Sequence, residues 1–152
     1  MKKLSLLFLY KENEILLALK KRGFGQGLWN GVGGKQQLGE NIKETAIREC
    51  QEEILVTPKS LNNVAKLMFN YADGQSMLVY VYLSEHWQGE PKESEEMKPQ
   101  WFNFNDIPYQ EMWPDDQYWL PKIINKDKVK AEFNFDTNNR IIDYQLDVVD
   151  TL

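Results

Sequence analysis

GKQQLGENIKETAIRECQEEILV, residues 34–56, is the stretch that decides the fold of this chain. Asn41 is a favoured helix N-cap, and Glu44 three residues later completes a capping-box pattern. An apolar residue then recurs at every fourth position, namely at Ile42, Ala46, Cys50 and Ile54. The stretch therefore predicts an amphipathic helix over residues 42–54, entered through a glycine-rich loop.

Three carboxylates of this helix project in the same direction. Glu49, Glu52 and Glu53 fall at positions i, i+3 and i+4, and such residues share one helix face. Like charges placed in this way are destabilising unless something compensates them, and Mg²⁺ prefers carboxylate oxygen. On these three residues alone, however, a solvated acidic helix face is the commoner explanation.

Length and composition indicate an ordinary globular protein. We expect the 152 residues, 1–152, to form one domain. Hydrophobic residues make up 42% of the chain and charged residues 27%, which is enough for a core. The net charge of −5 argues against stable nucleic-acid binding, although a small phosphate-bearing substrate is compatible with it.

Two residue types are present only once, and this restricts the chemistry. Cys50 is the only cysteine, so no intramolecular disulfide can form, and its place on the apolar helix face predicts a buried, inert thiol. His86 is the only histidine, and one histidine builds neither a zinc site nor a catalytic triad. No apolar run approaches membrane-spanning length. We interpret the opening MKKLSLLFLY as a first strand rather than a signal peptide, and expect a cytoplasmic protein without a membrane partner.

The rest of the chain alternates strand and turn patterns. Strands are predicted at residues 4–10, 14–20, 61–71, 76–84, 98–104, 129–135 and 140–149, with hairpin turns at Asp73-Gly74 and Asn138-Asn139 and a loop over 86–96. A second helix is predicted to start near Pro114, with acidic residues at its favoured end. Its expected inward side consists of Tyr118, Trp119, Ile123 and Ile124. Strands with two interspersed helices predict an α/β or α+β fold with helices flanking a mixed sheet.

The spacing around the first helix resembles the Nudix box. The matching residues are Gly34, Glu40, Arg48, Glu49, Cys50, Glu52, Glu53 and Val56. One position departs from the family pattern, because the family usually has glycine where this chain has Leu55. A left-handed residue is favoured there. Either Leu55 adopts that conformation at a cost of roughly 1 kcal/mol or more, or the turn takes another shape.

The resemblance implies an α/β/α sandwich with a loop–helix–loop catalytic motif. It also implies an enzyme that hydrolyses a nucleoside diphosphate linked to another group, using Mg²⁺ or alternatively Mn²⁺. The metal ligands carried over by position are Glu49, Glu52, Glu53 and the Gly33 carbonyl, with Glu96 as a further candidate. Arg48 would hold the acidic cluster by pairing with a carboxylate, and Glu40 would brace it. Glu53 is the first candidate for the general base and Glu96 the second, while Glu52 is also counted as catalytic.

Three further segments narrow the resemblance to one branch of the family. KKRGFGQGLWNGVGGK (20–35), EEMKPQWF (95–102) and MWPDDQYW (112–119) are similar to the MutT-homologue branch. That likeness implies hydrolysis of oxidised purine nucleoside triphosphates, of the 8-oxo-dGTP and 2-hydroxy-dATP type, to the monophosphate and pyrophosphate. Such an activity keeps damaged nucleotides out of DNA.

The residues of these segments suit a purine pocket. The amide of Asn30 matches a base edge, and Trp113 and Phe24 offer flat faces for stacking, worth about 1–3 kcal/mol per base. Asp115 and Asp116 are adjacent, so one pKa of the pair should rise, and one carboxyl could then donate a hydrogen bond while the other accepts. The weaker candidates for substrate contact are Lys20, Ser5, Phe69, Met77, Gly34 and Lys35.

Several alternatives stay open at this point. Asp115 could cap the second helix and Trp113 could fill the core. The substrate could be another nucleoside triphosphate, a dinucleoside polyphosphate or ADP-ribose. The chain could also be a non-catalytic, nucleotide-sensing Nudix module. We expect a monomer whose partner is a small-molecule nucleoside triphosphate.

Overall fold

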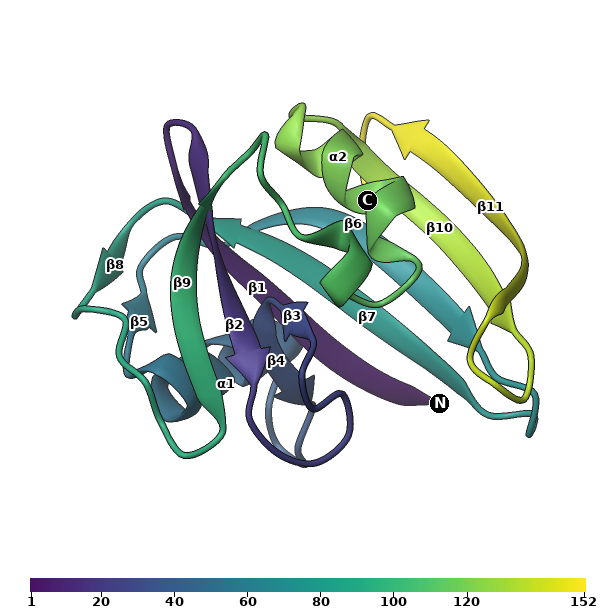
Figure 1. Cartoon of the computed structure of the whole chain (residues 1–152), viewed down its shortest axis with the longest axis horizontal. Helices are drawn as coiled ribbons and strands as arrows, with labels where there is room; N and C mark the ends of the chain where they lie inside the picture. The colour runs from purple at the N-terminus through teal and green to yellow at the C-terminus, as the bar shows by residue number, and fades with distance from the viewer.

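In the computed structural model, which describes residues 1–152, a mixed β-sheet carries an α-helix on each face (Figure 1). The helices are α1 (Ile42–Ile54), α2 (Asp116–Ile124) and a 3₁₀ turn η1 (Tyr109–Glu111). The strands are β1 (Lys2–Lys11), β2 (Glu14–Lys20), β3 (Trp29–Asn30), β4 (Val32–Lys35), β5 (Thr57–Pro58), β6 (Asn62–Asn70), β7 (Ser76–Ser84), β8 (Trp87–Gln88), β9 (Met97–Asn103), β10 (Lys128–Phe135) and β11 (Ile141–Val149). No helix is long and apolar enough to cross a membrane.

The strand order confirms the predicted mixed sheet. Hydrogen bonding runs in the order β11-β10-β6-β7-β1-β2-β3, and β4 pairs with β1 while β9 pairs with β2. The β1–β7 and β6–β10 pairs are parallel, and the other pairs are antiparallel. β1 therefore lies at the centre, with β7 on one side and β4 on the other.

Alternation along β1 separates two apolar clusters. Phe8 points to the face covered by α2 and packs in a cluster with Trp119 and Leu120. Leu7 and Leu9 point to the opposite face and pack with residues of α1 such as Cys50. Since side chains of a strand alternate between its faces, one strand supports both halves of the molecule.

Helix α1 begins and ends where the sequence predicts. The Asn41 side chain accepts a hydrogen bond from the Glu44 N–H at 2.9 Å, and the Glu44 carboxylate accepts one from the Asn41 N–H at 3.0 Å. This capping box satisfies two backbone donors that would otherwise lack partners. Cys50 is fully buried on the apolar side, as expected.

Two predicted loops contain short strands. The glycine-rich entry to α1 forms β3 and β4, because glycine lets the β4 backbone approach β1 so closely that a Cβ on Gly33 would overlap the Ser5 carbonyl oxygen. The predicted loop over 86–96 includes β8, which pairs with β5. These four short strands lack the alternating apolar and polar pattern by which a strand is predicted from sequence.

The predicted inward orientation of Tyr118 was wrong. Its side chain is 37% exposed and stacks on the ring of Tyr144 from β11, with the centroids 4.6 Å apart. α2 packs over β10, so a residue on its outer flank meets the edge strand rather than the core. Trp119 and Ile123 are buried as predicted.

Leu55 ends α1 in the left-handed conformation, at φ 64° and ψ 33°. Its N–H donates to the Gln51 carbonyl at 3.1 Å, and its side chain is 53% exposed. The chain therefore keeps the helix-closing geometry that glycine normally serves, and uses a residue for which that geometry is strained.

Replacing Leu55 by glycine should stabilise the protein. We expect Leu55→Gly to raise the free energy of unfolding by about 1 kcal/mol and the melting temperature by about 2–4 °C. Leu55→Ala is the matched control, because it removes the exposed side chain but keeps a Cβ in the left-handed region. Thermal unfolding of both variants checks this, and equal stabilities would contradict it.

Candidate active site

One cavity of about 260 Å³ collects most of the residues predicted to contact substrate. It lies among β1, β4, the 23–28 loop, the start of α2 and the near ends of β6, β7 and β10. Predicted residues that line it are Ser5, Lys20, Phe24, Asn30, Gly33, Gly34, Glu53, Phe69, Met77, Trp113, Asp115 and Asp116. Small-molecule sites usually start at about 300 Å³, so this hollow suits a group the size of a nucleobase.

The adjacent carboxyls of Asp115 and Asp116 are both buried in the cavity wall. Asp115 does not cap α2 with its side chain. Its Oδ2 accepts a hydrogen bond from Trp119 Nε1 at 2.8 Å instead, one helical turn further on. The capping alternative for Asp115 is thus excluded, and the indole fixes the orientation of this carboxylate.

Burial and mutual repulsion keep a proton on this pair. Burial raises the pKa of Asp115, although the Trp119 hydrogen bond opposes the shift. The pKa of Asp116 lies well above its ordinary value because of burial, the Asp115 charge and a hydrogen bond to Asp115. We therefore assign the proton to Asp116, which makes one member of the pair a donor and the other an acceptor.

Two polar atoms of the cavity wall are buried without a hydrogen-bond partner. They are Ser5 Oγ and Asp116 Oδ2. Buried polar atoms in folded proteins are almost always hydrogen-bonded, and leaving one unpaired costs about 1–3 kcal/mol. Their position in the same hollow points to a polar ligand that satisfies both.

Aromatic and amide groups also line the cavity. The rings of Phe24 and Trp113 lie 5.0 Å apart with an interplanar angle of 32°. Asn30 Oδ1 accepts a hydrogen bond from the Gly31 N–H at 2.8 Å, so its NH₂ group remains available to a ligand. The cavity thus offers flat aromatic faces together with hydrogen-bond donors and acceptors.

Glu53 lines the same cavity. Its Oε2 accepts a hydrogen bond from the Gly33 N–H at 3.3 Å, and the side chain is buried. Burial, followed by the charge of Glu49, raises the pKa of Glu53 to about 8. Burial also raises the pKa of Glu49, although Arg48 opposes that shift. Acidic groups are therefore crowded here without sufficient positive charge, and Glu53 holds its proton more tightly than an ordinary glutamate.

Arg48 binds the acidic cluster together. Its guanidinium contacts Glu40 at 2.6 Å, Glu49 at 2.8 Å and Glu52 at 3.3 Å. Its Nη2 also donates to the Lys35 carbonyl at 3.3 Å, which ties α1 to the end of β4. The hydrogen bond from Arg48 is the main reason that the pKa of Glu40 falls to about 2.

The carboxylates of Glu49, Glu52 and Glu53 are the type of ligand that a hard divalent cation prefers. They do not converge on one point in this structure. No three His, Cys, Asp or Glu side chains converge in a way that could hold a metal ion. Glu49 and Glu52 turn toward Arg48 instead. The raised pKa values of Glu49 and Glu53 nevertheless indicate carboxylates that lack sufficient positive charge. A Cβ on Gly34 would lie 2.5 Å from the Glu49 carboxyl carbon, so the glycine leaves room for that carboxylate.

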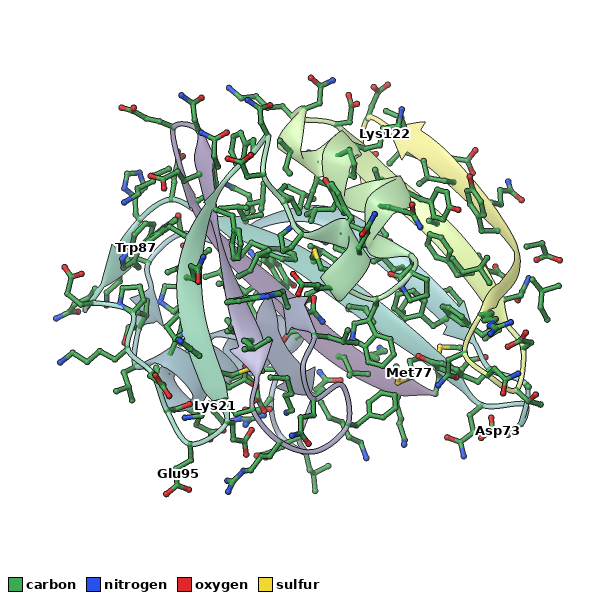
Figure 2. All side chains as sticks on the ribbon, viewed as in Figure 1. Lys21, Asp73, Met77, Trp87, Glu95 and Lys122 are labelled. Atoms are coloured by element: carbon green, nitrogen blue, oxygen red, sulfur yellow. The ribbon has the colours of Figure 1, made fainter.

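Five predicted site residues lie outside the cavity lining, namely Lys35, Arg48, Glu49, Glu52 and Glu96. Glu96 pairs with Lys20 and Arg22, each at 3.7 Å, on neighbouring loops that also carry Lys21 and Glu95 (Figure 2). Lys35 lines a separate, open hollow at the start of β1. Glu52 is largely exposed on the flank of Arg48.

Sequence analysis missed several lining residues. Tyr71, Trp119, Phe135 and Asn139 all border the cavity. Trp119 could have been found, because it follows Asp115 by four residues on a helix, where side chains meet. Tyr71 directly follows β6 and Phe135 ends β10, and the parallel β6–β10 pairing brings the two residues side by side.

Comparison with known proteins agrees with this geometry. A model of the NUDIX domain matches residues 4–123. The chain is 40% identical over 148 residues to the oxidized purine nucleoside triphosphate hydrolase of Mus musculus, covering 97% of this chain and 95% of the relative. The protein of the same name from Danio rerio is 39% identical over 152 residues, covering 99% and 97%. A crystal structure of a MutT protein from Bacillus halodurans has the same fold, with a TM-score of 0.85 at 23% identity over 97% of this chain and 98% of that one.

Replacing the buried acid Asp116 by a neutral amide should stabilise the fold. A raised folded-state pKa means that stability falls as pH rises from the ordinary aspartate value toward the folded-state value. We therefore expect Asp116→Asn to melt above the wild type at about pH 7.5, and the gap to shrink at about pH 4.5.

Asp136→Asn is the control with the opposite sign. Backbone hydrogen bonds from Arg140 and Asn138 lower the pKa of Asp136, so its charge stabilises the fold above the ordinary aspartate value. This variant should melt below the wild type at about pH 7.5. A melting temperature of Asp116→Asn below that of the wild type at that pH would refute the assignment of a destabilising buried acid.

Proposed function

The chain belongs to the NUDIX domain family, and we propose that it hydrolyses oxidised purine nucleoside triphosphates to the monophosphate and pyrophosphate. The observation that carries this proposal is that the Asp115–Asp116 pair and Glu53 line one and the same cavity. The base of a nucleotide could then bind in this cavity against the aspartate pair, with its phosphates directed toward Glu53. The names of the mammalian and fish relatives support the same substrate class.

The cavity wall around the aspartate pair suits a purine with altered donors and acceptors. Protonated Asp116 can donate to the base, and Asp115 can accept from it. Exchange of the proton within the pair would let the same wall fit either oxidised guanine or oxidised adenine. Trp113 and Phe24 would stack on the heterocycle, and Ser5 Oγ would gain a partner.

Nudix hydrolases generally need a divalent metal, and we propose Mg²⁺, with Mn²⁺ as the alternative. The residues that would hold it are Glu49, Glu52, Glu53 and the Gly33 carbonyl. When bound, such an ion supplies positive charge to the phosphates and lowers the pKa of a water molecule. Arg48 would keep the carboxylates in place through its contacts with Glu40 and Glu49.

Glu53 is our choice for the general base. Water attacks the phosphoanhydride between the α and β phosphates, and the P–O bond to the bridging oxygen breaks, which separates the monophosphate from pyrophosphate. A proton of the attacking water passes to the ionised Glu53 carboxylate. Glu53 lines the cavity, whereas Glu96 lies outside it in ion pairs with Lys20 and Arg22. The N–H of Gly33 fixes the orientation of Glu53.

The proposal extends to the setting of the enzyme. We propose that residues 1–152 act as one domain and as a cytoplasmic monomer on free nucleotides. The net charge of −5 disfavours stable binding to nucleic acid. The role would be to remove damaged nucleotides before they enter DNA.

A substrate panel tests the proposed function. We expect kcat/KM for 8-oxo-dGTP or 2-hydroxy-dATP to exceed that for dGTP by at least about tenfold, because only the oxidised bases match the aspartate pair. Asp116→Asn should remove most of this preference. Pyrophosphate release with each nucleotide provides the measurement. Equal turnover of all three, or faster turnover of ADP-ribose or a dinucleoside polyphosphate, would reject the substrate assignment.

Substitution of the base tests the mechanism. We expect Glu53→Gln to lower kcat by about 100-fold or more while the melting temperature stays within a few degrees of the wild type. Glu44→Gln is the matched control in the same helix, since glutamine also serves a capping box. Near-normal turnover of Glu53→Gln would discard Glu53 as the base and turn attention to Glu96.

A further inference from the structure

Tyr71 brings a hydroxyl group to the cavity wall that the proposed recognition scheme does not use. The residue follows β6 and lines the same hollow as Asp115 and Asp116. Its backbone closes the β6–β7 turn, because its N–H donates to the Gln75 carbonyl at 2.9 Å and its carbonyl accepts from the Gly74 N–H at 3.0 Å. The position of the side chain is therefore set by the turn.

Stacking on Phe135 fixes the orientation of the Tyr71 ring. It stacks on Phe135 of β10, with the centroids 5.3 Å apart and the planes 14° from parallel. Phe135 in turn packs against Phe69 at 5.7 Å, and all three rings line the cavity. A stacked ring cannot turn away without losing this contact.

The hydroxyl group of Tyr71 lacks a partner in the protein. Burial, followed by the charge of the Asp115 carboxylate, raises the pKa of Tyr71 to about 12, and no side-chain hydrogen bond contributes to that shift. The phenol therefore stays protonated at neutral pH and can both donate and accept. It lies in the electrostatic neighbourhood of the carboxylate that we assign as the acceptor.

We propose that Tyr71 is a specificity-determining residue, whose hydroxyl hydrogen-bonds the heterocycle held by Asp115 and Asp116. The inference rests on the proposed function and adds to it a third polar contact with the base. A fixed hydroxyl discriminates between substrates because a base that cannot match it forgoes a hydrogen bond that the preferred base makes. The residue thus contributes to the choice among purines rather than to the hydrolytic step.

Tyr71→Phe isolates the hydroxyl, because it keeps the ring and its stacking on Phe135. We expect kcat/KM for the preferred oxidised purine nucleotide to fall by about three- to tenfold, and kcat/KM for dGTP to change by less than about twofold. Tyr118→Phe is the matched control, since it removes a hydroxyl at the exposed Tyr144 stack outside the cavity. That variant should keep the wild-type ratio of the two values.

A binding measurement separates recognition from catalysis. The affinity of the wild type and of Tyr71→Phe for 8-oxo-dGMP and dGMP can be measured by calorimetry in EDTA, where no hydrolysis occurs. We expect the variant to lose about three- to tenfold in affinity for 8-oxo-dGMP only. If the wild type itself fails to prefer oxidised purines, the proposed function fails. If the wild type prefers them and Tyr71→Phe keeps the same ratio, only the role of Tyr71 is overturned.

Tyr109→Phe tests whether the hydroxyl groups of Tyr71 and Tyr109 affect turnover only through their electrostatic effect on the aspartate pair. Burial and the Asp116 charge raise the pKa of Tyr109 to about 12, but Tyr109 does not line the cavity. If Tyr71 makes a direct contact, only Tyr71→Phe changes the ratio between oxidised and plain purines. Parallel changes in both variants, with the ratio preserved, would contradict a direct contact by Tyr71.

Discussion

The close approach of β4 to β1 is the constraint on which the site depends. Gly33 lies opposite Leu6 in an antiparallel ladder, and a side chain on Gly33 would overlap the carbonyl of Ser5. Because this pairing is tight, the Gly33 N–H reaches Glu53 of α1 from one side of the strand. Ser5, on the neighbouring strand, lines the same cavity. A backbone contact that only glycine permits therefore holds Glu53 and Ser5 at the same cavity.

The site contains two groups of acidic residues, and positive charge compensates them unequally. Arg48 contacts three carboxylates, but Glu53 is buried beyond its reach and keeps a raised pKa. In the Asp115–Asp116 pair, an indole N–H, backbone N–H groups and a shared proton offset the negative charge only in part, and the pKa of both carboxyls stays raised. Such unmatched groups lower the stability of the free protein, and a ligand that satisfies them regains that free energy on binding. Active sites are commonly built in this way.

The sequence could predict what depends on local spacing. The capping box of Asn41 and Glu44, the apolar face of α1 and the hairpin between β10 and β11 all follow from short periodic patterns, and the structure has them as predicted. β3, β4, β5 and β8 are too short to show a pattern, and they form because distant backbone segments meet. For the same reason, most substrate residues could be listed from motifs, whereas Tyr71 and Phe135 required the β6–β10 pairing.

The residues that we propose for recognition and for hydrolysis are supported by different halves of the core. The Asp115–Asp116 pair belongs to α2 and its N-terminal approach, and α2 packs on the cluster around Phe8 and Trp119. Glu53 belongs to α1, which packs on the opposite cluster around Leu7 and Cys50. Substitutions in the two clusters should therefore be close to additive, because residues that share no partners rarely couple. Under the proposed roles, substitutions in α2 and at the end of β6 would change the base that is bound, while Arg48 and the carboxylates of α1 stay unchanged.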